Sequence, residues 1–373
     1  MSAMSSEMGE EASFVYRTHM IDQGTGDDDV GDGPDDPRMA TFVPSLAAKL
    51  TLAAPTTLPP ERKARIIQIE KKRVLKGHAE AVMSICFSPD SLTLASGSDD
   101  KTVRLWDSAS GNLKTIFSGH LGRILGLRFI GSGTILFSSS KDKTVVEWDL
   151  LRNQHRKTLE GHTNVVWSCC LTQDGTQAIS VSHDETIRYW DTMSGALLKT
   201  IKKVGAPGPA PGTHHTSTIY KIQPSPNGKM FATCSADKSV RIWDLASGTH
   251  IKALMGHTSH VTGVDWVSNT KLVSCSWDET IRLWDLDSAT TDYVYTGHNS
   301  KVHCVAVSAD GDCFATGAED KLVKVWRIST LEHFVSLAGH TEEVMGVAWS
   351  GDGELLASCS LDKTIRTWKI LSV

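Results

Sequence analysis

The chain has 373 residues with ordinary proportions of hydrophobic (40%) and charged (22%) side chains and a net charge of −5. Residues 1–60 hold ten acids and three bases, a net −7, which leaves +2 for the rest; this is too little positive charge for direct binding to nucleic acid. No signal peptide and no run of eighteen apolar residues is present, so we expect an intracellular protein without a membrane span.

The first 60 residues differ in composition from the rest of the chain. They include GDDDVGDGPDDP, an acidic, Gly- and Pro-rich segment that predicts a tail without structure when free. Whether a partner orders this tail stays open. Residues 61–373 form the predicted folded domain.

From about residue 70 onward the sequence repeats itself seven times. A Trp recurs every 41 or 42 residues, with one interval of 53. An Asp stands six residues before each Trp, and a His stands 27 or 28 residues before it. The seven Trp residues are Trp106, Trp148, Trp190, Trp243, Trp284, Trp326 and Trp368.

Each unit contains three short β-type runs separated by turn residues, as in AVMSICFS, LTLASGS and TVRLWD, and a fourth run leads to the next Gly-His. The combination of GH with SGSDDKTVRLWD and its six counterparts resembles the WD-repeat family, over roughly five-sixths of the chain. The resemblance implies an all-β fold, a single seven-bladed β-propeller. Radial closure also suits this many strands, because one open sheet of that size would twist severely.

The last unit ends at WKILSV, directly after its third run, so its blade lacks an outer strand. Residues 66–75 precede the first Gly-His and are expected to complete blade seven, which removes an exposed edge. Lys71, Lys72 and Arg73 in this segment are interpreted as solvated charges on an outer strand rather than as a nucleic-acid site.

A Ser accompanies the His, Asp and Trp in six units, at positions 98, 140, 182, 235, 276 and 360, and Ala318 replaces it in the sixth unit. A catalytic set is needed once, whereas this set repeats, so we interpret it as structural. The resemblance implies a buried network in which Trp bonds to Ser, Ser to His and His to Asp. On this interpretation the sixth unit, with Ala318 and with Arg327 after its Trp, is the weakest.

No nucleophile, phosphate-loop or zinc-protease motif occurs in the sequence. The eight Cys residues show neither a CxxC pair nor zinc-ligand spacing, so we expect reduced thiols in the core. The sequence therefore predicts a protein that is not an enzyme and that carries no metal and no cofactor.

In the WD-repeat family, the residues three and five positions after each His and the residue before each turn Asp face the top of the propeller. The resemblance therefore implies a protein-binding top face with an aromatic arc on blades three to five and three acids on blades six, seven and one. The rings are interpreted as partner contacts, with packing between blades as the alternative, and the acids as attractive to a partner's Lys or Arg. The candidate residues are Met83, Asp99, Arg123, Lys141, Trp167, His183, Tyr220, His260, Trp277, His303, Glu319, Glu343 and Met345.

The leading functional hypothesis is a non-enzymatic scaffold or assembly subunit, a monomeric cytoplasmic propeller that binds proteins or peptide segments within a multiprotein complex. One alternative is a reader of basic peptides such as histone tails. Another is the substrate receptor of a ubiquitin ligase, although no Trp-Asp pair here is followed by x-Arg. The sequence does not separate cytoplasm from nucleus or cilium. The Pro- and Gly-rich insertion at 202–214 is either a lid beside Tyr220 or a tolerated loop.

Overall fold

The computed structural model describes residues 67–131, 133–202 and 213–372. The predictions for the N-terminal tail and for the insertion fall on 1–60 and mainly on 203–212, outside the described residues. The described segments form 28 strands. They contain no helix that is long and apolar enough to cross a membrane.

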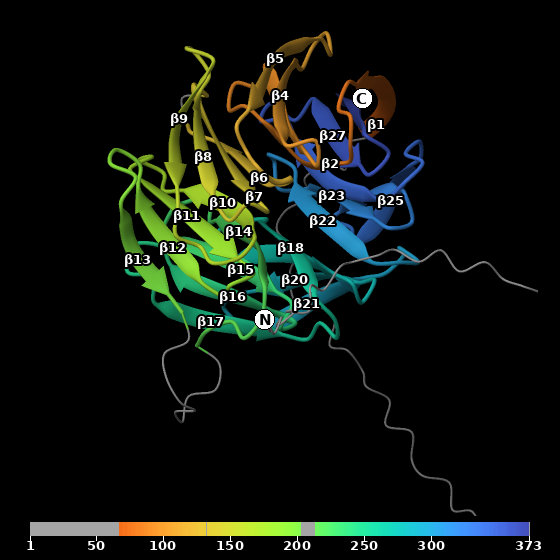
Figure 1. Cartoon of the computed structure of the whole chain (residues 1–373). Coiled ribbons are helices and arrows are strands. Elements are labelled where there is room, and N and C mark those ends of the chain that lie inside the picture. The colour runs from red at the N-terminus through yellow and green to blue at the C-terminus, as the bar shows by residue number, and fades with distance from the viewer. Residues whose placement is uncertain (1–66, 132, 203–212, 373) are drawn as a thin grey trace, which may run out of the picture. The chain divides into compact units, whose positions relative to one another are not determined.

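The strands pair into seven antiparallel sheets of four, which surround a common axis and confirm the predicted propeller (Figure 1). Blade one consists of β2 (Val82–Phe87), β3 (Thr93–Ser98), β4 (Thr102–Asp107) and β5 (Leu113–Ser118), and blade two of β6 (Ile124–Phe129), β7 (Ile135–Ser140), β8 (Val145–Asp149) and β9 (Gln154–Leu159). Blade three consists of β10 (Val166–Leu171), β11 (Gln177–Ser182), β12 (Ile187–Asp191) and β13 (Leu197–Ile201), and blade four of β14 (Ile219–Pro224), β15 (Met230–Ser235), β16 (Ser239–Asp244) and β17 (His250–Met255). Blade five consists of β18 (Val261–Trp266), β19 (Lys271–Ser276), β20 (Ile281–Asp285) and β21 (Thr290–Tyr295). Blade six consists of β22 (Val302–Val307), β23 (Cys313–Ala318), β24 (Val323–Arg327) and β25 (Glu332–Leu337). Blade seven consists of β26 (Val344–Trp349), β27 (Leu355–Ser360), β28 (Thr364–Ser372) and β1 (Ile67–Lys76).

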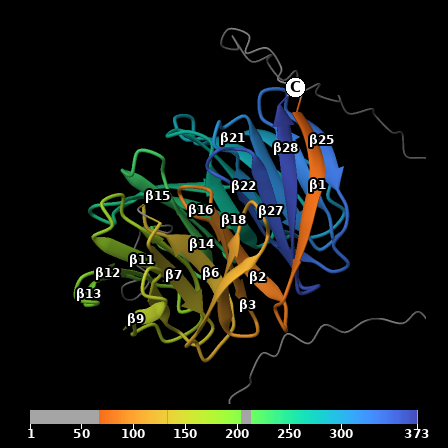
Figure 2. The same cartoon turned by 90° about the horizontal axis from the view of Figure 1, so that it is seen from above.

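Blade seven is assembled from both ends of the described chain. β1 pairs antiparallel with β28, and the two strands lie side by side in Figure 2. The pairing runs from Ile67 opposite Ser372 to Lys76 opposite Thr364, and Leu75 is buried in the core of this blade. The expectation that residues 66–75 close the ring is therefore confirmed, and closure leaves β28 without an open edge.

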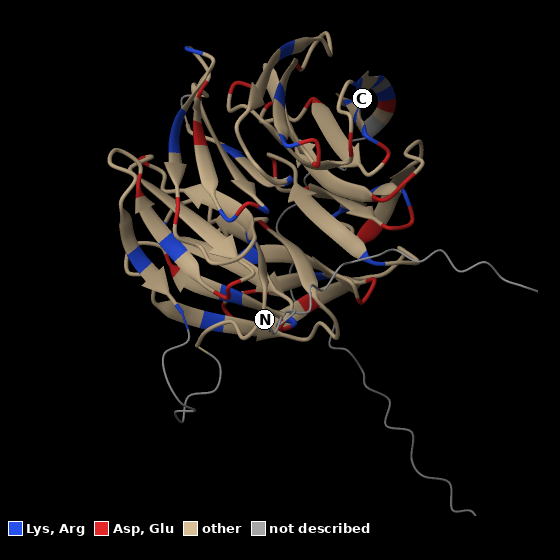
Figure 3. Ribbon diagram, in the orientation of Figure 1, with Lys and Arg blue, Asp and Glu red and all other residues tan. Residues whose placement is uncertain are grey.

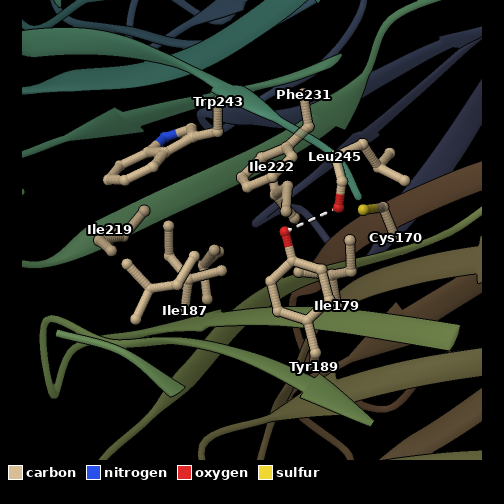
Figure 4. Packing of buried hydrophobic residues seen from close by; sticks show 11 residues of the cluster. Cys170, Ile179, Ile187, Tyr189, Ile219, Ile222, Phe231, Trp243 and Leu245 are labelled. Carbon is tan, nitrogen blue, oxygen red and sulfur yellow. Dashed lines mark hydrogen bonds between the residues drawn. The ribbon is translucent and has the colours of Figure 1, made fainter. Parts of the chain in front are cut away.

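Large apolar side chains fill the space between neighbouring blades. Between blades three and four, Ile179, Tyr189 and Phe231 pack with Trp243, which is 1% exposed (Figure 4). The Tyr189 hydroxyl donates a hydrogen bond of 3.1 Å to the Leu245 carbonyl, so the buried polar atom has a partner. Each blade is thus fixed against the next by contacts between residues far apart in the sequence.

The Trp, His and Asp of each repeat are joined through one hydroxyl on the second strand. In blade three, Trp190 Nε1 donates to Ser180 Oγ at 2.8 Å, and Ser180 Oγ lies 2.8 Å from His162 Nε2. The other imidazole nitrogen, Nδ1, lies 2.8 Å from the Asp184 carboxylate. The same network occurs in every blade, with the hydroxyls of Ser96, Ser138, Ser180, Thr233, Ser274, Thr316 and Ser358.

The charges of this network follow from burial and hydrogen bonding. Burial lowers the pKa of His162, against the opposing effect of Asp184, so the imidazole is neutral at pH 7. Burial alone would raise the pKa of Asp184, but hydrogen bonds from His162 and Thr186 outweigh it and lower that pKa. A neutral imidazole between a hydroxyl and a carboxylate satisfies each buried group, as a structural network requires.

The predicted serine positions were wrong by two residues. Ser98 Oγ donates to the Glu80 carbonyl at 3.2 Å and accepts the Asp100 N–H at 3.0 Å, so this serine closes a turn instead. Side chains two residues apart point to the same face of a strand, so the direction of the side chains does not distinguish Ser96 from Ser98 in the SGS segment. Ser or Thr occupies the correct position in all seven repeats, and this regularity was the available signal.

Blade six consequently keeps its network. Thr316 Oγ1 accepts the Trp326 N–H at 2.8 Å and lies 2.8 Å from His298 Nε2, so Ala318 removes no member of it. The longest Trp bond is in blade seven, where Trp368 Nε1 lies 3.3 Å from Ser358 Oγ. The expectation that Ala318 interrupts the network is therefore wrong; what Ala318 lacks is the turn-closing hydroxyl that Ser98 provides in blade one.

Candidate protein-binding face

One end of the propeller brings together three positions from each blade. In every blade the N–H of the residue before the turn Asp donates to the carbonyl of the residue three positions after the His; for Trp277 and His260 the distance is 2.9 Å. We call the resulting surface the upper rim. It consists of Ala81, Met83 and Asp99; Arg123, Leu125 and Lys141; Val165, Trp167 and His183; Thr218, Tyr220 and Ala236; His260, Thr262 and Trp277; Lys301, His303 and Glu319; and Glu343, Met345 and Leu361.

Four rings of blades three to five form a contiguous aromatic cluster on the upper rim: Trp167, Tyr220, His260 and Trp277. The Trp167 and Tyr220 ring centres are 5.1 Å apart, and Tyr220 lies 6.1 Å from His260 and 6.3 Å from Trp277. His260 stacks on Trp277 at 4.5 Å. All four rings are partly exposed, and each lies in contact with a neighbour, so the aromatic residues of blades three to five form one continuous cluster.

The cluster is also anchored to the blades beneath it. Tyr220 packs against the hydrophobic core of blades four and five, so the alternative of packing between blades holds in part for this ring. Its hydroxyl lies 3.3 Å from His260 Nδ1. Burial raises the pKa of Tyr220 to about 12, so the phenol stays neutral. His183, next to the cluster, is exposed, and its Nδ1 lies 3.0 Å from Thr218 Oγ1.

Cations border the aromatic cluster. Lys301 Nζ lies 5.5 Å from the centre of the Trp277 ring, within range of a cation–π contact. Burial and then the charge of Lys238 lower the pKa of His260, so this imidazole is neutral at pH 7. Two cations therefore lie beside the cluster, and one of them, Lys301, is paired with Glu319.

The three predicted acids do not form the free acidic arc that we expected. Asp99 Oδ1 lies 3.4 Å from Arg123 Nε, and Glu319 Oε2 lies 3.8 Å from Lys301 Nζ. Burial raises the pKa of Asp99, and the charge of Arg123 opposes this rise.

Glu343 is the third predicted acid, and it is buried. Its Oε2 lies 2.9 Å from His303 Nε2, and the side chains are 11% and 9% exposed. Each of the three acids therefore already has a partner on the upper rim, so none of these carboxylates projects freely towards a Lys or Arg of a bound segment.

The remaining candidates lie at the edges of this surface. Met83 and Met345 are partly buried, and Met345 packs against the core of blades seven and one. Lys141 is exposed and lines a shallow depression of about 500 Å³ together with Asp99 and Arg123. These residues contribute to the shape of the upper rim rather than to the aromatic cluster.

The described residues contain no group of three or more His, Cys, Asp or Glu side chains placed to hold a metal ion. The eight cysteines have free thiols, and six of them are buried. Burial raises the pKa of Cys86, Cys169 and Cys304 to about 12, so these thiols stay protonated at pH 7.

Comparison with known proteins finds short, similar segments. The chain is 54% identical to vegetative incompatibility protein HET-E-1 of Podospora anserina over 39 residues, which is 10% of this chain and 3% of that protein. It is 70% identical to protein Notchless of Drosophila melanogaster over 33 residues (9% and 7%). It is 45% identical to pre-mRNA-splicing factor PRP46 of Yarrowia lipolytica over 42 residues (11% and 10%). The matches thus span about one repeat and at most a tenth of these relatives.

A family model, "WD domain, G-beta repeat", matches seven segments of the chain, residues 69–107, 111–149, 153–191, 211–244, 248–285, 290–327 and 331–369. Six of these segments span the outer strand of one blade and the first three strands of the next, the segment 211–244 spans the first three strands of blade four, and together they cover more than half of the chain. The chain therefore belongs to the WD-repeat family.

Proposed function

We propose that this protein is a non-enzymatic interaction scaffold or assembly subunit that binds segments of partner proteins on its upper rim. The observation that supports this proposal is the aromatic cluster. Large, rigid rings that are partly exposed around a concave centre provide much contact area at a small entropic cost, and they are enriched among residues that dominate binding energy. WD-repeat propellers bind other proteins or peptides, which agrees with this role.

The charges around the cluster favour one kind of partner segment. Lys301 and Lys238 lie beside the rings, and the acids of the upper rim are paired. A segment with an aromatic or aliphatic anchor complements the rings, and a neighbouring carboxylate on it would meet Lys238 and Lys301. We therefore favour such a segment over the basic peptide of a histone-tail reader.

We propose that the propeller acts as a monomer within a heteromeric complex inside the cell. Relatives named as a ribosome biogenesis protein and a pre-mRNA-splicing factor agree with a role in large assemblies, and they make the nucleus as suitable a location as the cytoplasm. Nothing among the described residues favours a ubiquitin-ligase receptor in particular.

Affinity capture tests this proposal. The full-length protein and a Trp167→Ala/Tyr220→Ala/Trp277→Ala variant are used as baits in matched cell lysates, and bound proteins are quantified. We expect the triple variant to lose specific partners that the wild type retains. A control variant removes three exposed apolar side chains from outer strands, Leu113→Ala, Leu198→Ala and Ile251→Ala, and should retain them.

A second variant separates loss of binding from loss of fold. Lys301→Glu keeps every ring and reverses one charge beside Trp277. We expect it to weaken the same partners while leaving the melting temperature nearly unchanged, because Lys301 is about half exposed. Retention of every partner by both the triple variant and Lys301→Glu would refute the proposed binding face.

A further inference from the structure

The upper rim carries an exposed leucine at a position where the other repeats have a small or polar residue. Leu121 directly follows the His of blade two and is 82% exposed. The residues at this position in the other blades are Ala79, Thr163, Thr216, Thr258, Asn299 and Thr341. A single exposed leucine is common in proteins, so its surroundings decide whether it has a role.

Leu121 lines the depression of about 500 Å³ between blades one and two. The other lining residues are three cations, two acids and a glycine: Lys101, Arg123, Lys141, Asp99, Asp142 and Gly122. Charged residues of the propeller lie mostly in turns and along outer strands (Figure 3), and these three cations lie in the segments between strands that reach the upper rim. An apolar side chain and a group of cations therefore share one concave surface.

This concentration of positive charge occurs between one pair of blades. Five rim positions hold it: the residues before and after the turn Asp of blade one, the residues one and three positions after the His of blade two, and the residue before the turn Asp of blade two. They contain three cations and one acid here, whereas the same five positions of every other blade pair contain at most two cations. The depression is thus specific to blades one and two of this chain.

The two acids of the depression are already engaged by other side chains. Asp99 Oδ1 lies 3.4 Å from Arg123 Nε. Asp142 Oδ2 lies 2.7 Å from His120 Nδ1, and its Oδ1 accepts the Thr144 N–H at 3.0 Å. Neither carboxylate is therefore available to pair with the lysines.

The lysines of the depression have no partner of their own. Within the described part of the chain, no ion pair and no hydrogen bond engages the ammonium of Lys101 or of Lys141, and both side chains are exposed. Lys143 is also exposed and lies in the same turn as Lys141. Because these ammonium groups come from two separate turns, several negative charges spread along an extended segment match them better than one compact anion does.

The backbone beneath the depression is fixed by contacts between two turns. The Lys141 N–H donates to the Arg123 carbonyl at 2.9 Å, and the Leu121 N–H donates to the Asp142 carboxylate at 2.9 Å. A Cβ at Gly122 would lie 2.7 Å from the Asp142 nitrogen, so only glycine fits where the turns meet. A surface that is already held in place loses little conformational entropy when a partner binds.

We propose that the depression between blades one and two binds an acidic segment of a partner protein, with an apolar side chain on Leu121 and flanking carboxylates beside Lys101 and Lys141. The apolar contact removes area from water, and the charges set the orientation of the segment and raise its rate of association. This inference rests on the proposed function of the upper rim, and it adds a second contact region whose chemistry differs from that of the aromatic cluster.

Fluorescence anisotropy of the full-length protein with two labelled peptides, EELEELEE and EEAEEAEE, tests the proposal. We expect saturable binding that is tighter for the leucine peptide and that weakens for both when NaCl is raised from about 50 to about 300 mM. Lys101→Asn and Lys141→Gln should each weaken binding of the leucine peptide about threefold, and the double variant about tenfold. Asn is tolerated at position 101, where φ is 66°.

Leu121→Thr separates the apolar contact from the attraction between charges. It introduces the residue that blades three, four, five and seven have at this position. We expect it to weaken binding of EELEELEE about threefold or more and to leave binding of EEAEEAEE unchanged. General attraction to a positive surface would respond to the lysine variants alone.

Two controls locate the binding. Lys321→Asn makes the same change at the same turn position of blade six, where φ is 67°, and should bind both peptides as the wild type does. The Trp167→Ala/Tyr220→Ala/Trp277→Ala variant should also bind both. No saturable binding of EELEELEE, wild-type binding by the lysine variants, or an equal effect of Leu121→Thr on both peptides would overturn the acidic docking site and leave the aromatic cluster unaffected. Loss of binding in the triple variant alone would place the acidic segment on the aromatic cluster instead.

Discussion

The clearest test of the blade network replaces one of two neighbouring serines on β11. Ser180→Ala removes the hydroxyl that accepts the Trp190 N–H and donates to His162 Nε2, and all three side chains are buried. Each orphaned buried group costs about 1–3 kcal/mol, so the free energy of unfolding should fall by about 2–6 kcal/mol. From the unfolding entropy per residue, the melting temperature should fall by about 3–9 °C.

Ser182→Ala is the matched control, with the same chemical change two residues along the same strand. Ser182 Oγ bonds only backbone groups of the turn, the Asn164 carbonyl at 3.2 Å and the Asp184 N–H at 3.0 Å. Ser182 itself is buried, but the turns that carry Asn164 and Asp184 are partly exposed and their backbone groups can bond water instead, so we expect a smaller loss than for Ser180→Ala, about 1–2 kcal/mol. Thermal unfolding followed by circular dichroism measures both variants. Equal shifts, or a larger shift for Ser182→Ala, would refute our assignment of the network.

Three further predictions follow from the same geometry. A chain that begins at Arg62 should have the melting temperature of the full-length protein. A chain that begins at Gly77 lacks β1 and leaves β28 unpaired, so it should melt at a much lower temperature or aggregate. Equal melting temperatures of the two chains would contradict ring closure by β1. Thr316→Val should destabilise blade six about as much as Ser180→Ala destabilises blade three, and Ala318→Ser should have little effect. A larger effect of the substitution at position 318 than at position 316 would show that the network runs through position 318 instead. Stability should decline as the pH falls through about 6.5, because burial lowers the pKa of His78, His162, His215 and His257 below that of the unfolded chain, which then binds more protons. The stability should decline again below about pH 4, because the pKa of Asp100 is lowered to about 2 in the folded protein and the unfolded chain takes up the proton first. A melting temperature that stays constant from pH 8 to pH 5 would contradict the buried neutral imidazoles.

The number of blades and the closure of the ring could be predicted from the sequence alone. Strand lengths, turn residues and the positions of Trp, His and Asp are local features that recur every 41 or 42 residues, so the repeat itself encodes them. The sequence also shows that the last unit lacks an outer strand and that an additional strand precedes the first unit. The residues of the upper rim were implied by the resemblance to the WD-repeat family, which assigns them by their distance from the His and Asp of each repeat.

Contacts between blades were decided only by the tertiary structure. The sequence placed Glu343 among free acids, yet His303 of the neighbouring blade lies 2.9 Å away, across forty residues of chain. The two positions of each second strand share one face, so side-chain direction does not separate them; the packed Trp and His identify the position that holds Ser or Thr in all seven repeats. Pairings of this kind depend on the distance between blades, which no periodic pattern within a blade specifies.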